Sequence, residues 1–160
     1  LRWMIDHGVG ATIRAYGGDP DAGLRAAREG TVGLARWTRE LRQAMNARPG
    51  HIAFLSALKR AAFTETPGAR GKLLFVNAGI DTTRPLSAQS DSFWWASNAF
   101  RSISALFGDY GLIVRGYDPR HAGCEAGDYT LSIDAGSGFD GKLLAACLGR
   151  DGEVIEVLEA

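Results

Sequence analysis

The chain has 160 residues, of which 46% are apolar and 22% charged, the composition of a soluble globular protein. Eighteen basic residues balance eighteen acidic ones, so the chain lacks the net positive charge that draws in nucleic acid or an anionic membrane. No apolar run is long enough to span a membrane, and residues 1–5 do not open a signal peptide. Because Cys124 and Cys147 lack metal-ligand spacing, we expect reduced thiols and a cytoplasmic protein. The chain begins with Leu1, so we also expect a processed, truncated or partial protein.

The first part of the chain has the periodicity of amphipathic helices. A short helix is expected over residues 21–29, after the Gly-Gly-Asp-Pro turn. Apolar residues then recur at helical spacing in two stretches separated by Pro49-Gly50, at Leu34, Trp37, Leu41 and Met45 and at Ile52, Leu55, Leu58 and Ala62. This pattern predicts a helical segment over residues 1–66.

Beyond a linker at residues 64–70, the pattern changes to short strands. Strands are expected at residues 72–76, 112–115, 129–134, 143–148 and 154–158. One helix is expected among them, over residues 97–107, because Phe100, Ile103, Leu106 and Phe107 share a helical face. Asp151-Gly152 predicts a hairpin turn. The sequence therefore indicates an α/β fold, with a helical segment followed by a mixed sheet over residues 72–160.

The end of the first predicted strand is the most informative position. Leu-Leu-Phe-Val at residues 73–76 leads directly into Asn77, Ala78 and Gly79. A buried strand that ends in a polar residue and a glycine commonly delivers that residue to a site, as in open α/β sheets. Asn77 is therefore a candidate site residue.

Three segments, taken in order, resemble one known family. Residues 75–89 contain Phe-Val-Asn-Ala-Gly-Ile-Asp and Arg-Pro-Leu-Ser-Ala-Gln, ahead of Phe93-Trp94-Trp95. Residues 113–119 read Ile-Val-Arg-Gly-Tyr-Asp-Pro, and residues 133–143 read Ile-Asp-Ala-Gly-Ser-Gly-Phe-Asp-Gly-Lys-Leu. Together they resemble the C-terminal portion of the calcineurin-like metallophosphoesterases, of the serine/threonine phosphoprotein phosphatase and diadenosine tetraphosphatase type.

This resemblance implies a phosphoester hydrolase with two divalent cations (Mn, Fe, Zn or Mg) held at strand ends. Asn77 and Tyr117 stand where the family has metal-binding histidines, and the family's other ligand motifs do not occur here in a usable setting. We therefore expect that this chain alone does not form the dinuclear centre. His121, four residues past Tyr117, is either a replacement ligand or a solvated loop residue.

Two arginines beside the strand ends are candidate phosphate ligands. The guanidinium groups of Arg84 and Arg115 could bind phosphate oxygens in a bidentate way, without a metal. In the alternative interpretation they are surface residues paired with Asp81 and Asp118. These two aspartates are in turn either metal ligands or a general acid, or side chains that stabilise loops.

Two other features have a structural and a functional interpretation. Trp94 and Trp95 either stack on a nucleobase or pack in the core, with one buried and the other partly exposed. The glycines at positions 136, 138 and 141 do not match a phosphate-binding fingerprint, so tight turning between strands is the better explanation.

Two functional hypotheses follow. The first is the C-terminal half of a metal-dependent phosphoester hydrolase, inactive alone, that acts on a phosphorylated small molecule or phosphoprotein. The second is a degenerate relative that binds phosphate or a protein without hydrolysis. Because the sheet would leave an edge open where an N-terminal half pairs, we expect association with that half or with a second copy.

Overall fold

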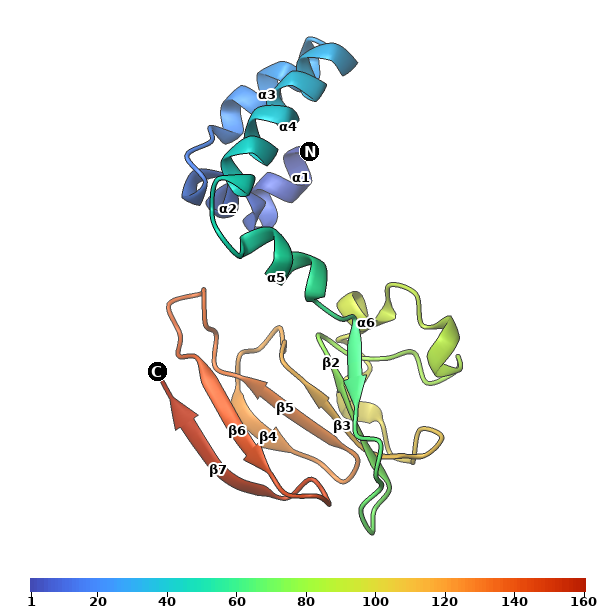
Figure 1. Cartoon of the computed structure of the whole chain (residues 1–160). Coiled ribbons are helices and arrows are strands. Elements are labelled where there is room, and N and C mark those ends of the chain that lie inside the picture. The colour runs from blue at the N-terminus through green and yellow to red at the C-terminus, as the bar shows by residue number, and fades with distance from the viewer. The chain divides into compact units, whose positions relative to one another are not determined.

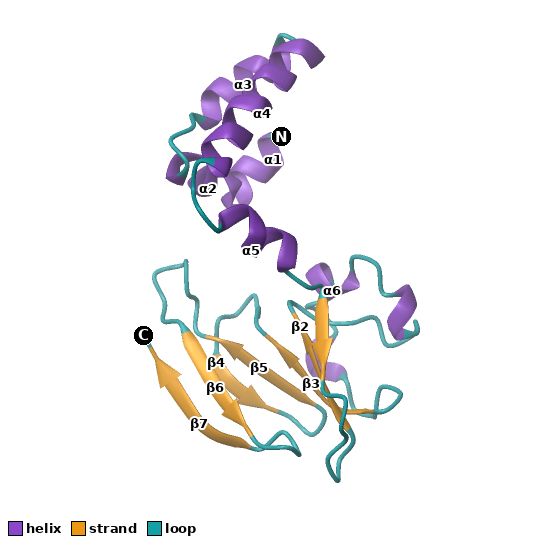
Figure 2. Ribbon diagram, viewed as in Figure 1, coloured by secondary structure: helices purple, strands orange, loops and turns teal.

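A boundary after Leu58 divides the chain into two units. The computed structural model describes all of residues 1–160. Residues Leu1–Leu58 form a helical unit, and residues Lys59–Ala160 form a sheet unit (Figures 1 and 2). The predicted α/β class, with helices ahead of a mixed sheet, is confirmed. None of the helices combines the length and apolar character needed to cross a bilayer.

The helical unit contains five α-helices and one π-helical turn. In chain order these are α1 (Arg2–Met4), the π-helical turn η1 (Ile5–Val9), α2 (Gly10–Ala15), α3 (Pro20–Arg28), α4 (Thr31–Asn46) and α5 (His51–Ala57). Helix α3 begins at Pro20, one residue before the expected start, because the Asp19 carboxylate accepts a hydrogen bond from the Asp21 backbone N–H at 2.9 Å and Pro20 occupies the first turn.

Helices α3 and α4 pack against each other through a small residue. Gly23 of α3 lies directly against the Trp37 ring of α4, and a Cβ atom at Gly23 would lie 2.5 Å from that ring. Leu34, Trp37, Leu41 and Met45 are the partly buried face of α4, as their spacing predicted. The opposite face of α4 is exposed.

The sheet unit contains a five-stranded sheet and a two-stranded one. The larger sheet has the order β1-β2-β3-β5-β4, and β6 pairs with β7 in the smaller one. The strands are β1 (Ala61–Phe63), β2 (Lys72–Val76), β3 (Tyr110–Arg115), β4 (Gly123–Ala126), β5 (Thr130–Asp134), β6 (Leu144–Leu148) and β7 (Val154–Glu159).

Three neighbouring strands of the larger sheet run parallel. β3 lies between β2 and β5 and is parallel to both, whereas β1 and β4 are antiparallel edge strands. The carboxyl ends of β2, β3 and β5 therefore meet at one edge of the sheet. We call this edge the carboxyl edge, and open α/β sheets place ligands there.

Side chains of successive strand residues enter two separate cores. Leu74 and Val76 belong to a cluster with Ile80, Phe93, Phe100 and Ile113. Leu73 belongs to another cluster with Leu112, Val114 and Leu131, against which Leu148 of β6 packs. This alternation follows from the two-residue period of a strand. Both faces of the central strands are therefore covered. Because a one-residue slip would move each side chain to the opposite face, this packing fixes the register of the strands that end at the carboxyl edge.

Three sequence-based predictions of local structure were wrong. The helix expected over residues 97–107 is absent, and the segment instead contains only the 3₁₀ turn η3 (Phe100–Ser102). Phe100 is 1% exposed in the core, so tertiary packing overrides the helical spacing. Ala62, expected at the end of a helix, lies in β1. Strand β4 was not predicted, because its four residues include Gly123 and alternate weakly.

Candidate functional site

The backbone joins the ends of β2 and β3 at the carboxyl edge. The Asn77 carbonyl oxygen accepts hydrogen bonds from the backbone N–H groups of Gly116, at 3.1 Å, and Tyr117, at 2.8 Å. Asn77 and Tyr117 are the two positions at which the resemblance implies metal-binding histidines. The structure brings them together, although they are forty residues apart in the sequence.

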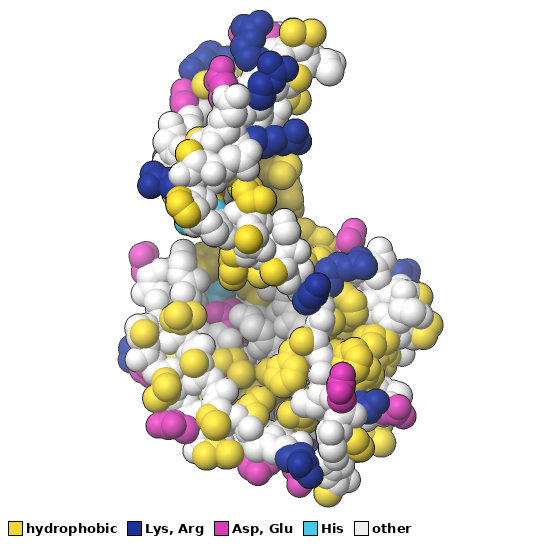
Figure 3. Space-filling view, viewed as in Figure 1, with side chains coloured by type: hydrophobic (Ala, Val, Ile, Leu, Met, Phe, Trp, Pro, Cys, Tyr) yellow, Lys and Arg dark blue, Asp and Glu magenta, His cyan; other side chains and the backbone are white.

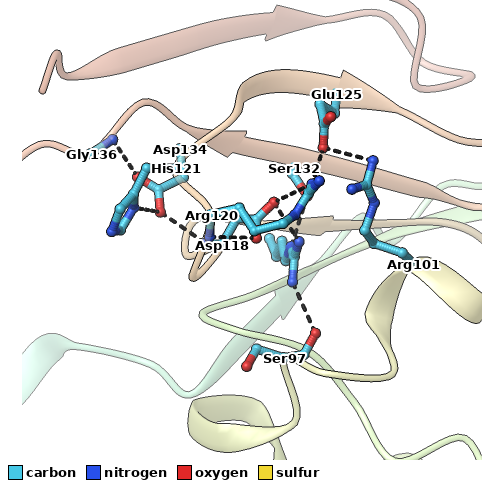
Figure 4. Close-up of polar contacts among 10 residues, drawn as sticks. Ser97, Arg101, Asp118, Arg120, His121, Glu125, Ser132, Asp134 and Gly136 are labelled. Atoms are coloured by element: carbon cyan, nitrogen blue, oxygen red, sulfur yellow. Dashed lines mark hydrogen bonds and ion pairs between the residues drawn. The ribbon is translucent and has the colours of Figure 1, made fainter.

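A histidine from the loop after β3 and an aspartate at the end of β5 complete the site. The Nδ1 atom of His121 lies 2.9 Å from Oδ2 of Asp134, the last residue of β5 (Figure 4). The expectation of a solvated loop histidine is wrong, because the side chain of His121 is only 25% exposed and has this partner. His121 has a positive φ of 49°, an uncommon conformation for a residue with a side chain. Such strain is often found at functional sites.

Asp134 is held ionised by the surrounding backbone. Its two carboxylate oxygens accept hydrogen bonds from the N–H groups of Asp118, at 2.8 Å, and Gly136, at 2.9 Å. Burial by itself would raise the pKa of Asp134, but these hydrogen bonds and His121 together lower it. The carboxylate therefore fixes the Asp118 turn and orients the His121 ring at the same time.

Aromatic rings surround His121. Phe139 stacks on the imidazole, with ring centroids 4.7 Å apart, and Tyr117 meets it edge to face at 6.0 Å. Phe139 is 67% exposed and lies in a tight loop between β5 and β6. This loop uses positive φ at Gly136 and Gly138, and Gly141 lies so close to Ala135 that a Cβ atom would clash with its carbonyl oxygen. Tight turning thus explains these glycines, as expected.

Arg115, a predicted phosphate ligand, lies inside the protein. Its side chain is 1% exposed, its guanidinium is 2.8 Å from the Asp118 carboxylate, and it lies 4.3 Å above the Phe100 ring. It also donates hydrogen bonds to the Ser132 hydroxyl, at 2.7 Å, and to the Ser97 carbonyl oxygen, at 3.2 Å. The expected pairing with Asp118 is present, but it is buried rather than on the surface.

Asp118 is a poor candidate for a general acid. Burial alone would raise its pKa, but the backbone N–H of Arg120 and the Arg120 and Arg115 guanidinium groups outweigh burial and lower it. Arg120 also forms an ion pair with Glu125, and Glu125 forms a second ion pair with Arg101 at 3.0 Å. Asp118 is therefore an ionised member of a charge network that holds the loop after β3.

Arg84 and Asp81 form the expected pair in the loop after β2. Their side chains lie 3.1 Å apart, and Asp81 also accepts hydrogen bonds from the Thr83 hydroxyl and backbone N–H. The Thr83 hydroxyl, then its N–H, lower the pKa of Asp81 despite a small opposing effect of desolvation, and Arg84 adds to this. Asp81 thus stabilises a loop, and the Arg84 side chain is 56% exposed.

The buried side chain of Gln89 holds that loop through hydrogen bonds to its backbone. It is 0% exposed, donates hydrogen bonds to the carbonyl oxygens of Asp81 and Arg84, and accepts one from the Asp81 N–H, each at 2.8 Å. In the sequence, Gln89 stands out only as part of the family resemblance. Arg84 and Gln89 line an open hollow of about 370 Å³ with Ser90, Asp91, Ser92, Trp95 and Ala96.

Neither tryptophan of the adjacent pair is in the core. Trp94 is 37% exposed and Trp95 is 67% exposed, whereas Phe93 is 7% exposed and packs in the first core cluster. The expected arrangement, with one buried tryptophan, is therefore wrong. The buried aromatic position is one residue earlier in the chain.

The side chains at the carboxyl edge do not fit a complete dinuclear metal centre. No group of three or more His, Cys, Asp or Glu side chains is placed to hold a metal ion. Asp118 is engaged by two arginines, and Asp134 by two backbone N–H groups and His121. Asn77 and Tyr117 are weak substitutes for imidazole ligands. The set is better suited to hydrogen bonding than to binding Mn, Fe, Zn or Mg.

Comparison with models of protein families, with curated proteins and with solved structures finds no match to this chain. The assignment of a function therefore depends on the geometry of the carboxyl edge and on the sequence resemblance.

Proposed function

We propose that residues 59–160 are the C-terminal half of a metallophosphoesterase-type domain, and that this half binds a phosphorylated ligand without hydrolysing it. The observation that carries the proposal is the His121–Asp134 pair at 2.9 Å, placed at the carboxyl edge of three parallel strands. The ligand is a phosphorylated small molecule or a phosphoprotein. It would be held by hydrogen bonds in place of metal ions.

The donors at this edge are of the right kind for a phosphate group. The Asn77 amide and the Tyr117 hydroxyl are neutral donors. The Nδ1–H of His121 can donate to Asp134, and in the imidazolium form the other ring nitrogen also carries a proton that can be donated to a ligand. Such a charged donor binds phosphate more strongly than a neutral one. Asp81 and Asp118 stay ionised, so neither supplies a proton to a leaving group.

A metal-dependent phosphoester hydrolase is the second candidate. The observation that favours it is again His121, because histidines that bind metals commonly donate their other ring N–H to a carboxylate. The remaining acid and histidine ligands would have to come from another segment. β7 pairs only with β6, so its outer edge offers a place for a strand of such a segment.

Titration of the ¹⁵N-labelled full chain with inorganic phosphate tests the first candidate. We expect the backbone amide signals of Asn77, Tyr117 and His121 to shift together and to saturate. His121→Gln should weaken phosphate binding by about tenfold or more, since loss of one charged hydrogen bond costs about 1.5 kcal/mol or more. His7→Gln, in the helical unit, is the matched control and should have no effect. Absence of saturable shifts at the carboxyl edge would contradict the proposal.

A further inference from the structure

The exposed face of α4 carries arginines that have no acidic partner. Arg36, Arg39 and Arg42 are exposed, and none of them forms an ion pair within the chain. They lie three or six residues apart, so they project from one side of the helix. Glu40 is the only acidic residue of α4 and lies beside this stripe.

Apolar side chains lie between these arginines. Val32 is 74% exposed, and Ala35 is exposed one turn further along the same side. A shallow hollow on this face is lined by Thr31, Val32, Ala35, Arg36 and Arg39. We call this surface, Val32 to Arg42 on the outer side of α4, the basic face. Arginine is enriched in protein–protein interfaces relative to the rest of the protein surface.

The charge of the basic face is part of a wider asymmetry. The helical unit has eight arginines and no lysine against five acidic residues, an excess of three positive charges. The sheet unit has ten basic and thirteen acidic residues, which gives the opposite excess. The neutral total therefore hides a basic helical unit, whose arginines appear in dark blue in Figure 3.

We propose that the basic face of α4 is a docking surface for an acidic protein segment with interspersed apolar residues. Charge complementarity favours a negatively charged partner, and each arginine guanidinium can bind a carboxylate through two parallel hydrogen bonds. Val32 and Ala35 provide the apolar contact. Nucleic acid fits less well, because the stripe has only three arginines and is interrupted by apolar residues, whereas phosphate backbones favour broader basic patches.

Fluorescence anisotropy with the full chain tests this proposal. The probe is a labelled peptide of repeating Glu-Glu-Leu triplets, and a Lys-Lys-Leu peptide is its charge-reversed control. We expect saturable binding of the acidic peptide only, weakened by added salt. Arg36→Glu with Arg39→Glu should lower affinity by about tenfold or more, because each reversal replaces attraction by repulsion. Val32→Ser should lower affinity by about threefold, because it removes apolar contact.

A matched variant separates a local surface from general attraction. Arg14→Glu with Arg48→Glu makes the same change in net charge away from the basic face and should alter affinity by less than about twofold. Arg36→Gln with Arg39→Gln checks the result without added acidic groups, and circular dichroism checks the helices. Equal loss in both reversed variants, or tighter binding of a single-stranded oligonucleotide than of the acidic peptide, would overturn the proposal.

Discussion

The imidazole of His121 lies 2.9 Å from the carboxylate of Asp134, although His121 precedes β4 and Asp134 is the last residue of β5. The same carboxylate accepts the backbone N–H of Asp118, so one side chain fixes both the turn after β3 and the histidine that follows it. This relationship makes the carboxyl edge a preorganised site. Removal of one partner should therefore affect both ligand binding and the loop.

Loss of the buried carboxylate beside Arg115 should be strongly destabilising. Asp118→Ala leaves the Arg115 guanidinium buried without its main acidic partner, and breaking a buried pair in this way costs about 3–5 kcal/mol. Urea unfolding followed by circular dichroism measures the change in the free energy of unfolding. Asp128→Ala, at an exposed position, is the control and should cost less than about 0.5 kcal/mol.

The double variant Arg115→Met with Asp118→Leu separates the pair from its individual charges. Replacing both charges with apolar side chains should cost less than the two single substitutions together, since no unpaired charge remains in the core. Additive costs would contradict a coupled pair.

Acid should destabilise the sheet unit through Asp118 and Asp134. Both carboxyl groups have a folded-state pKa below the ordinary value. Their contribution is present above the unfolded-state pKa of about 3.9 and is lost as pH falls from there through the folded-state values. Urea midpoints measured from neutral pH downward should therefore fall most steeply below about pH 4. Asp134→Asn should be less stable at neutral pH and lose less stability in acid, and an unchanged acid profile would be inconsistent with this role.

Gln89 should prove more important for the fold than its exposed neighbours. Gln89→Leu leaves the Asp81 N–H and the Asp81 and Arg84 carbonyl oxygens without a partner, which should cost about 2–3 kcal/mol. Hydrogen exchange at the Asp81 amide should become faster in this variant. Gln43→Leu, on the exposed side of α4, is the control. Slow exchange at Asp81 in the Gln89 variant would show that the loop does not depend on this side chain.

The loop that presents Phe139 should tolerate a side chain at one glycine but not at another. Gly141→Ala places a Cβ atom 1.9 Å from the Ala135 carbonyl oxygen, so the backbone must move and the cost should exceed about 2 kcal/mol. Gly138 has nothing within 4 Å, and its φ of 88° alone should make Gly138→Ala cost about 1–2 kcal/mol. Comparison of unfolding midpoints checks the order, and equal costs would contradict it.

Sequence patterns predicted the central strands well because their signal is local. Residues 72–76 form β2 as expected, and the end of β2 delivers Asn77 to the carboxyl edge. β5 begins at Thr130, one residue later than the expected start at residue 129. The helix predicted over residues 97–107 does not form, because Phe100 packs in the core against the Arg115 guanidinium. The local spacing of apolar residues does not encode this contact.

The candidate site was only partly predictable for the same reason. Asn77, Tyr117 and His121 follow strand ends in the sequence, so they could be named in advance. The burial of Arg115 and the role of Asp134 depend on strand pairing and on a turn with positive φ at His121, which are tertiary features. Asp134 had a weak signal, since it ends an apolar strand just before Ala135 and Gly136.

The most direct test of binding without hydrolysis uses p-nitrophenyl phosphate and the full chain. We predict that its ³¹P signal broadens on addition of protein in manganese-free buffer, and that no p-nitrophenol is released above the buffer rate when manganese is present. Release of p-nitrophenol that requires manganese and is abolished by Asn77→Ala would contradict this account and establish the hydrolase instead.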